Sequence, residues 1–282
     1  MDRYLSDKIS LGFLNESGIE DVASLSRTTS KGIDYLHALP KKETEGFDYL
    51  THYRIDHEKF DYTIQSPCTA QVEDERRVHE RILALISDSG NEILDVGCGG
   101  GWMAKAMHNT SNTLTSMDLS EINVEKVLDK YPSDKHHGIA ADSINHPFRE
   151  NSFDIIVASE VIEHVERPTL FLSSLARTLK PNGSIIITTP YKENIIKETC
   201  IHCNGITPRN AHLHSFDEHI LTSIAPSGTK ATYQIFGNKA LMMARAYKIF
   251  GKLGLKPYSA IDTLANKIIK KPAHILVKYK RA

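Results

Sequence analysis

The chain has 282 residues, of which 40% are hydrophobic and 24% are charged, a composition that allows one sizeable globular core. Its net charge of −1 gives no overall field that attracts nucleic acid, and four cysteines are too few for a disulfide framework. Because residues 1–10 lack the apolar stretch of a secretory signal and no apolar run reaches bilayer length, we expect a protein of the cytoplasm.

The first 70 residues show no clear periodicity and predict an irregular or partly helical arm that covers the site of the protein. Apolar residues then recur at helical spacing, so residues 71–282 are predicted to form one domain that opens with an amphipathic helix. Side chains that can line a site, but that we expect mainly to pack the arm onto the core, are Tyr49, His52, Tyr53, His57 and Tyr191.

Apolar runs alternate with helical patterns through the domain. Strands are predicted at residues 92–96, 113–117, 137–141, 153–159, 184–189, 232–236 and 274–279. Helices are predicted between them, and Ser120 and Ser215 are expected to cap two of these helices. The alternation predicts an α/β fold, a doubly wound and mainly parallel sheet with helices on both faces.

A glycine-rich turn joins the first predicted strand of the domain to the next helix. Gly97, Gly99 and Gly101 allow the backbone to turn sharply and approach a ligand, and the helix that follows favours a bound carboxylate. The dinucleotide fingerprint needs a further glycine where this chain has Trp102, which argues against a nicotinamide-dependent dehydrogenase.

Acidic residues stand at the ends of the first predicted strands. Asp95 directly precedes the glycine turn, Asp118 is placed to accept the ribose hydroxyls of a nucleoside, and Asp142 is placed to meet an adenine amino group. One such aspartate alone is more often a helix cap or a loop carboxylate. Together, beside one glycine turn, they predict a nucleoside site.

With the segments FDIIVASEVIEHV and LKPNGSIIITTP, these motifs resemble the class I S-adenosylmethionine-dependent methyltransferases over more than half of the chain. The resemblance implies a Rossmann-like methyltransferase fold, a seven-stranded sheet whose last strand is antiparallel. It also implies that Gly97, Gly99 and Gly101 border the methionine moiety, while Asp118 holds the ribose and Asp142 reads the adenine.

The string Glu160-x-x-Glu163-His164 follows the fourth of these strands. If a helical turn begins there, the side chains share one face, where they can bind a divalent cation or act as a general base. The string resembles that of ubiquinone-pathway O-methyltransferases and small-RNA 2′-O-methyltransferases. That resemblance implies a metal such as Mg²⁺ bound by Glu160, Glu163, His164 and a further histidine, His212 or His214. The alternative is that the string merely lines the pocket.

A second metal arrangement competes for the same histidines. Cys200 and Cys203 have the spacing of a zinc pair, and with His212 and His214 they can surround a structural Zn²⁺. A chance grouping of cysteines with a histidine-rich loop is the plainer alternative. One histidine cannot serve both metals, so the sequence leaves the choice open.

The segment 238–272, between the last two predicted strands, is basic. From Phe236 to the C-terminus, eleven lysines and arginines stand against one acid, Asp262, and apolar residues are interleaved among them. The pattern predicts either a basic amphipathic helix in a membrane interface or a helical hairpin packed on the sheet. RNA phosphate is a third partner, which the net charge of the whole chain disfavours.

These features predict an S-adenosylmethionine-dependent methyltransferase for a hydroxyl of a small-molecule, lipid-linked or glycan-precursor acceptor. Glu160, Glu163 and His164 are the predicted catalytic residues. Peripheral membrane contact is expected through residues 238–272. The alternatives are a noncatalytic nucleoside-binding or scaffold protein on the same fold, and an enzyme that methylates RNA.

Overall fold

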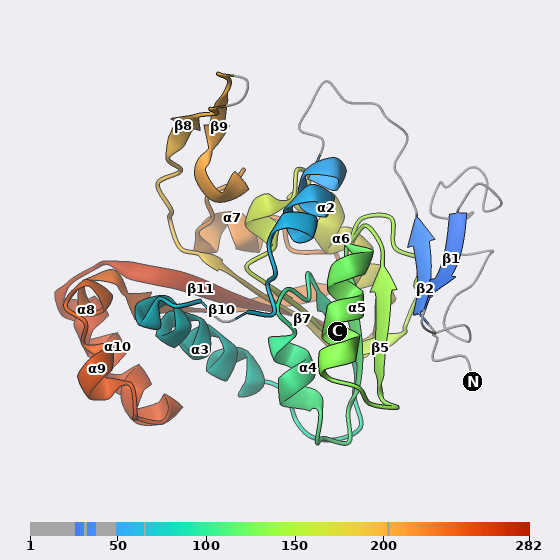
Figure 1. Ribbon diagram of the computed structural model, residues 1–282. Coiled ribbons are helices and arrows are strands. Elements are labelled where there is room, and N and C mark those ends of the chain that lie inside the picture. Colours follow the sequence, from blue (N-terminus) through green and yellow to red (C-terminus); the bar gives the residue numbers. More distant parts are fainter. Residues whose placement is uncertain (1–25, 31–32, 38–48, 65, 202–203) are drawn as a thin grey trace.

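The structure is a computed structural model that describes residues 26–30, 33–37, 49–64, 66–201 and 204–282. One mixed sheet runs through these residues, and helices cover both of its faces (Figure 1). Its strands, in spatial order, are β1 (Ser26–Ser30), β2 (Ile33–His37), β5 (His136–Ala140), β4 (Thr113–Asp118), β3 (Glu92–Val96), β6 (Phe153–Ser159), β7 (Leu179–Pro190), β11 (Pro272–Arg281) and β10 (Thr229–Asn238). A separate hairpin is formed by β8 (Lys197–Thr199) and β9 (Ile206–Pro208).

The seven strands from β5 to β10 form the predicted sheet. Neighbours from β5 to β7 are parallel, whereas β11 is antiparallel to both β7 and β10. The doubly wound fold and the antiparallel last strand are therefore confirmed. The central strands are almost continuously buried, as expected for a parallel sheet that is covered on both faces.

The arm contributes two strands that the sequence did not predict. Strand β2 pairs in parallel with β5 through Tyr35 and Ala140, and β1 pairs with β2 as an antiparallel hairpin. The expectation of an irregular or partly helical arm was therefore incomplete. The exposed edge of a sheet offers unpaired backbone groups to any extended segment, so pairing there needs no strong hydrophobic pattern.

Each face of the sheet carries its own helices. Those on one face are α3 (Thr69–Leu83), α4 (Trp102–Met107) and α5 (Glu121–Lys130), and those on the other are α6 (Pro168–Thr178) and α7 (Glu218–Ser223). Helix α2 (Tyr49–Lys59) belongs to the arm. Ser120 caps α5 as predicted, but the cap of α7 is Asp217 and not Ser215, because the Asp217 carboxylate accepts from two free amides of the first turn.

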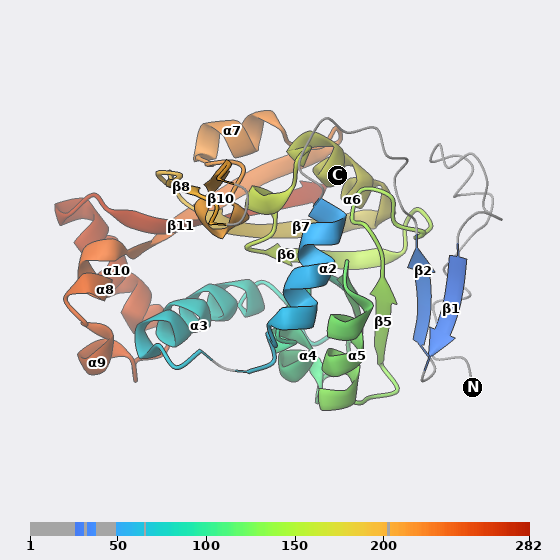
Figure 2. The ribbon, with the colours of Figure 1, turned by 45° about the horizontal axis from the view of Figure 1, so that its top comes forward.

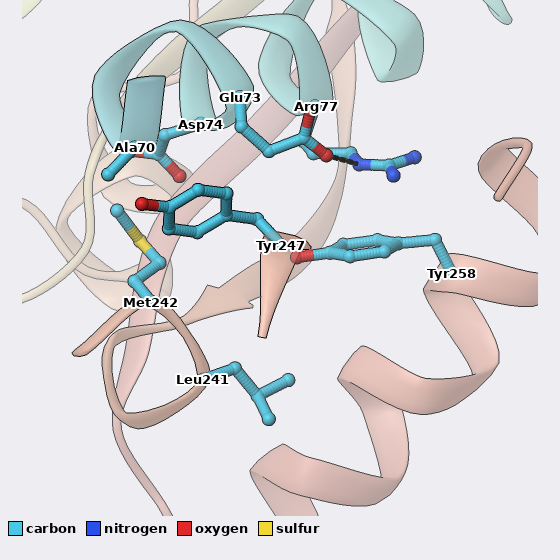
Figure 3. Close-up of a pocket in the computed structure, with 8 residues that line it drawn as sticks. All are labelled: Ala70, Glu73, Asp74, Arg77, Leu241, Met242, Tyr247 and Tyr258. Atoms are coloured by element: carbon cyan, nitrogen blue, oxygen red, sulfur yellow. Dashed lines mark hydrogen bonds and ion pairs between the residues drawn. The ribbon is translucent and has the colours of Figure 1, made fainter. Parts of the chain in front are cut away.

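The basic segment between β10 and β11 folds into three helices, α8 (Lys239–Met243), α9 (Tyr247–Phe250) and α10 (Leu255–Ile268), beside α3 (Figure 2). Arg77 of α3 donates to the carbonyl oxygens of Phe250 and Leu253, and its guanidinium lies 3.7 Å from the ring centre of Tyr258. Figure 3 shows the small pocket at this junction, lined by residues of α3, α8, α9 and α10.

A buried ion pair fixes α10 as well. Arg81 of α3 lies 3.4 Å from Asp262, and the same Asp262 oxygen accepts the Gly237 amide at 2.9 Å. The inner side of the basic segment is therefore packed, as the hairpin alternative predicted. Its outer side carries exposed apolar residues, which bear on the function proposed below.

Candidate active site

The glycine-rich turn follows β3 and is fixed by its neighbour β4. The amides of Gly97 and Cys98 donate to the Met117 carbonyl at 2.8 and 3.1 Å. Gly97 has a φ of 69°, and a Cβ there would lie 2.7 Å from a methyl group of Val161. Gly99 and Gly101 also have positive φ, so the turn depends on glycine at the predicted positions.

The predicted acids lie together at the carboxyl ends of β3, β4 and β5, which are neighbours in the sheet. Asp95 is fully buried, and burial together with Asp118 raises its pKa to about 7. An oxygen of Asp118 accepts from the Asn123 side chain at 3.0 Å, which holds the carboxylate beside the glycine turn. Burial raises the pKa of Asp142. Ligands of open α/β sheets bind at this edge.

Helix α2 lies over this edge of the sheet (Figure 2). Polar side chains of the helix contact the acids. The Tyr49 hydroxyl donates to Asp142 Oδ2 at 3.0 Å, and His57 Nε2 lies 3.6 Å from Asp118 Oδ1. Helix α2 of the arm therefore lies against the carboxylates that are predicted to hold the nucleoside.

The same face of α2 reaches the predicted catalytic string. Tyr49, Tyr53 and His57 are four residues apart and so share one face of the helix. The Tyr53 ring packs edge-on against the ring of His164, with centroids 5.8 Å apart. The three side chains were expected mainly to pack the arm onto the core, and each of them packs against a predicted site residue.

Glu163 and His164 lie on a single 3₁₀ turn that follows β6. Glu163 is 1% exposed, and its Oε2 accepts from the Thr189 hydroxyl at 3.0 Å. Its other oxygen, Oε1, is buried with no hydrogen-bond partner among the described residues. Burial, with Glu160 as the second cause, raises the pKa of Glu163 well above its usual value.

His212 joins this turn. The main-chain oxygen of Glu163 accepts from the Leu213 amide at 2.8 Å, and ligand atoms of Glu163, His164 and His212 lie within 4.8 Å of one another. Burial and then His212 lower the pKa of His164 to about 4, so this imidazole is neutral at neutral pH. His212 Nδ1 lies 2.5 Å from a Glu193 oxygen, the kind of carboxylate contact that orients metal-binding histidines.

Glu160 does not join this group. Its φ of 55° is left-handed, which breaks the helical phase between Glu160 and Glu163. The condition under which Glu160, Glu163 and His164 would share one face, a helical turn that begins at Glu160, is therefore not met. The Glu160 carboxylate lies instead 3.6 Å from His274 Nδ1, on β11. The sequence carried no signal for this contact, because a lone histidine in a distant strand is usually structural.

The alternative zinc set cannot be traced in full, because Cys203 lies outside the described residues. Cys200 directly follows β8, in the hairpin that extends away from the sheet (Figure 1). His212 and His214 follow the hairpin, and the His214 amide approaches the Glu163 carbonyl. His214 Nε2 is buried without a hydrogen-bond partner among the residues described.

Comparisons with known proteins agree with this geometry. Residues 94–187 match the model of the methyltransferase domain family. A solved S-adenosylmethionine dependent methyltransferase from Mesorhizobium loti shares the fold at 19% identity, with a TM-score of 0.54 over 74% of this chain and 100% of that one. The [4+2]-cyclase SpnF aligns over 83% of this chain and 94% of its own, at 16% identity and a TM-score of 0.55. The chain thus contains a class I S-adenosylmethionine-dependent methyltransferase domain.

Curated relatives indicate to which methyltransferases the domain is related. The mitochondrial ubiquinone biosynthesis O-methyltransferase of Schizosaccharomyces pombe is 36% identical over 110 residues, 36% of this chain and 38% of that protein. The ubiquinone biosynthesis O-methyltransferase of Rickettsia canadensis is 32% identical over 148 residues, 48% and 60% of the two chains. The chain is related to the ubiquinone biosynthesis O-methyltransferases, and it spans about half the length of these relatives.

Proposed function

We propose that this protein transfers a methyl group from S-adenosylmethionine to a hydroxyl of a small, quinone-like or lipid-linked acceptor. The observation that carries the proposal is that one edge of the sheet joins the glycine turn and its acids to the buried group of Glu163, His164 and His212. The methyl carbon changes its bond from the sulfonium sulfur to the acceptor oxygen, and the acceptor proton leaves to a base. Alignment in a covered site supplies much of the rate.

We also propose that Glu163, His164 and His212 hold a divalent cation. The partnerless Glu163 oxygen, the neutral His164 and the carboxylate contact of His212 all fit such a site. Two imidazoles and one carboxylate suit Mn²⁺ or Zn²⁺ better than Mg²⁺, which prefers oxygen ligands. A bound cation would acidify the acceptor hydroxyl.

In the version without a cation, Glu163 or His164 takes the acceptor proton directly. His212 lies with Glu163 and His164, which favours this group over the zinc set with Cys200 and Cys203. The noncatalytic scaffold remains the rival function, and the buried polar group argues against it because a binding protein would not need a partnerless carboxylate oxygen.

The test is methyl transfer itself. The protein is incubated with methyl-labelled S-adenosylmethionine, Mn²⁺ and a series of hydroxylated benzoquinones and catechols with and without apolar tails, and mass spectrometry locates the label. We expect the label on a hydroxyl oxygen. Label in added RNA instead would favour the RNA alternative, and cofactor binding without transfer to any acceptor, including a cell extract, would favour the scaffold.

We propose peripheral membrane contact through the outer side of residues 238–272. Met243, Ile249 and Ile268 are 83%, 76% and 73% exposed, and exposed lysines stand near them in the sequence. None of the helices in the described residues is long and apolar enough to cross a bilayer. Apolar side chains beside lysines suit the surface of an anionic membrane, where a lipid-linked acceptor would lie. Location in the cytoplasm stays a prediction from the sequence.

Sedimentation with anionic vesicles tests this contact. Each lysine near the surface contributes about 1 kcal/mol, and apolar burial adds about 25 cal/mol per Å², so salt should weaken binding without abolishing it. Serine at Met243, Ile249 and Ile268 should lower vesicle affinity even at low salt and leave the melting temperature unchanged. Serine at Leu170 and Ile122, exposed elsewhere, is the matched control. Equal sedimentation of both variants would rule out this surface.

Tyr49→Phe should tighten binding of S-adenosylmethionine. The Tyr49 hydroxyl donates to an oxygen of Asp142 that the adenine amino group is predicted to use, so the cofactor must displace it. Removing a competing hydrogen bond worth about 1 kcal/mol should improve the affinity roughly fivefold. Calorimetry measures this, with Tyr233→Phe on the exposed side of β10 as control. Weaker binding in the variant would mean that Tyr49 assists the cofactor.

A further inference from the structure

Thr189, near the end of β7, contacts the side chain of Glu163. Its hydroxyl donates to Glu163 Oε2 at 3.0 Å, and both residues are 1% exposed. Because strand residues alternate between the two faces of a sheet, Thr189 shares its face with Ile185 and Ile187. These two residues belong to the same hydrophobic core as Ile162, which begins the 3₁₀ turn that carries Glu163. The core therefore packs the turn against β7 and brings the hydroxyl to the carboxylate.

The loop after the β8–β9 hairpin holds the main chain of Glu163. The Glu163 carbonyl oxygen accepts from the amides of Leu213 and His214, at 2.8 and 3.3 Å. Oε2 accepts from Thr189, so Oε1 is the oxygen of Glu163 that has no hydrogen-bond partner in the part of the chain that the structure describes. A buried acceptor without a partner is costly, and a bound group that meets Oε1 would remove that cost.

We infer that Thr189 is a positioning residue, which holds one oxygen of Glu163 so that the other oxygen meets the bound group. The inference rests on the proposed function, in which Glu163 binds a cation with His164 and His212 or takes the acceptor proton. Carboxylates that bind metal ions are themselves oriented by hydrogen bonds from neighbouring groups. Loss of such a neighbour typically costs about 10- to 100-fold in metal affinity or activity.

The side chain of threonine suits this role. Thr189 is buried and β-branched, so its χ1 angle has few alternatives and its hydroxyl keeps one direction. Valine has nearly the same shape but cannot donate a hydrogen bond, and serine can donate but lacks the second branch. The two substitutions therefore separate the hydrogen bond from the packing of the side chain.

The test is the affinity for Mn²⁺, measured by calorimetry on the full chain. Thr189→Val should weaken Mn²⁺ binding about 10- to 100-fold, because Glu163 loses the hydrogen bond that orients it. Thr189→Ser keeps a hydroxyl and should recover most of this affinity. In the same variants kcat should fall and recover with the Mn²⁺ affinity. The KM for S-adenosylmethionine should not change, because the nucleoside is assigned to Asp118 and Asp142.

Thr178→Val is the matched control. Thr178 is also buried, and its hydroxyl donates to the Leu175 carbonyl oxygen at 2.8 Å, but it directly precedes β7 and so lies at the other end of that strand. This variant should lower the melting temperature and leave Mn²⁺ affinity and kcat unchanged. If Thr189→Val behaves like this control, or if Thr189→Ser recovers neither quantity, the role of Thr189 is structural and the inference is overturned.

A double variant distinguishes the inference from the proposed function. Adding Thr189→Val to Glu163→Gln should cause no further loss of turnover, because the carboxylate that Thr189 positions is already absent. A further loss as large as that of Thr189→Val alone would overturn the inference.

The cation site itself fails if wild type binds no Mn²⁺. In that case, a fall in kcat in Thr189→Val that Thr189→Ser reverses would still support the positioning of Glu163 as the group that takes the proton. An unchanged kcat in Thr189→Val would overturn the inference.

Discussion

Asp118→Ala is expected to weaken S-adenosylmethionine binding by about 1–3 kcal/mol, roughly 5- to 150-fold. The carboxylate is predicted to accept the ribose hydroxyls, and in its absence those hydroxyls lose a charged acceptor. Calorimetry of the variant and of wild type measures this change in binding free energy. In the same experiment, NAD should bind neither protein. Tighter binding of NAD than of S-adenosylmethionine by wild type would contradict the methyltransferase interpretation of the turn.

The control for this experiment must account for the structural contacts of Asp118. Its carboxylate also accepts from Asn123 and from the Ser120 amide, so removing it is expected to lower the melting temperature. Asp118→Asn keeps the volume and most of the packing and should still lose affinity. Asp134→Ala, at an exposed position, should change neither quantity.

Glu163→Gln is expected to reduce turnover by about 10²- to 10⁴-fold, the range for loss of a proton-transfer group. Glutamine keeps the acceptor for Thr189 but offers neither a charge to a cation nor a site for the acceptor proton. Affinity for S-adenosylmethionine should be unchanged, since the nucleoside is assigned to Asp118 and Asp142 and not to Glu163. Glu150→Gln, exposed on the surface, is the matched control.

A chelator separates the two roles of this group. If Glu163, His164 and His212 hold a cation, excess chelator should abolish turnover and Mn²⁺ should restore it. Full turnover in excess chelator would rule out a catalytic role for a cation. Direct proton transfer to Glu163 or His164 would then be the role that remains. Wild-type turnover by Glu163→Gln would show that Glu163 is neither a cation ligand needed for catalysis nor the group that takes the acceptor proton.

Much of the donor site was predictable because its residues are local in sequence. The glycine turn and the following aspartates each sit at the end of a buried strand, and strand ends of a parallel sheet meet at one edge. Hydrophobic runs predict where the strands lie, and they therefore also predict where the acids at the strand ends lie. Asp118 and Asp142 lie where the predicted strands put them.

The acceptor side was less predictable for a physical reason. The side chains of Glu160 and Glu163 would share one face only in a continuous helical turn, and the left-handed φ of Glu160 interrupts that turn. His274 reaches Glu160 only because β11 inserts next to β7, a pairing between segments far apart in the chain. Patterns of hydrophobicity specify strands, but not which polar side chains they bring together.

The arm strands were missed for a related reason. Strand β2 pairs with β5 through a single residue pair, Tyr35 with Ala140, and such edge pairing leaves little trace in composition. Helix α2 has no apolar stripe, so the rule that finds amphipathic helices does not find it either. It docks instead through Tyr49 and His57, onto carboxylates.

The polar docking of α2 has a consequence for timing. Because Tyr49 and His57 contact Asp142 and Asp118, which are predicted to hold the nucleoside, we expect that α2 must lift away before a nucleoside can bind or leave. The rate of donor association should therefore level off at high concentration, at the rate at which α2 lifts away. Departure of the demethylated cofactor waits on the same motion, as it does in enzymes whose turnover is limited by product release. The rate at which α2 moves would then limit the rate of the catalytic cycle.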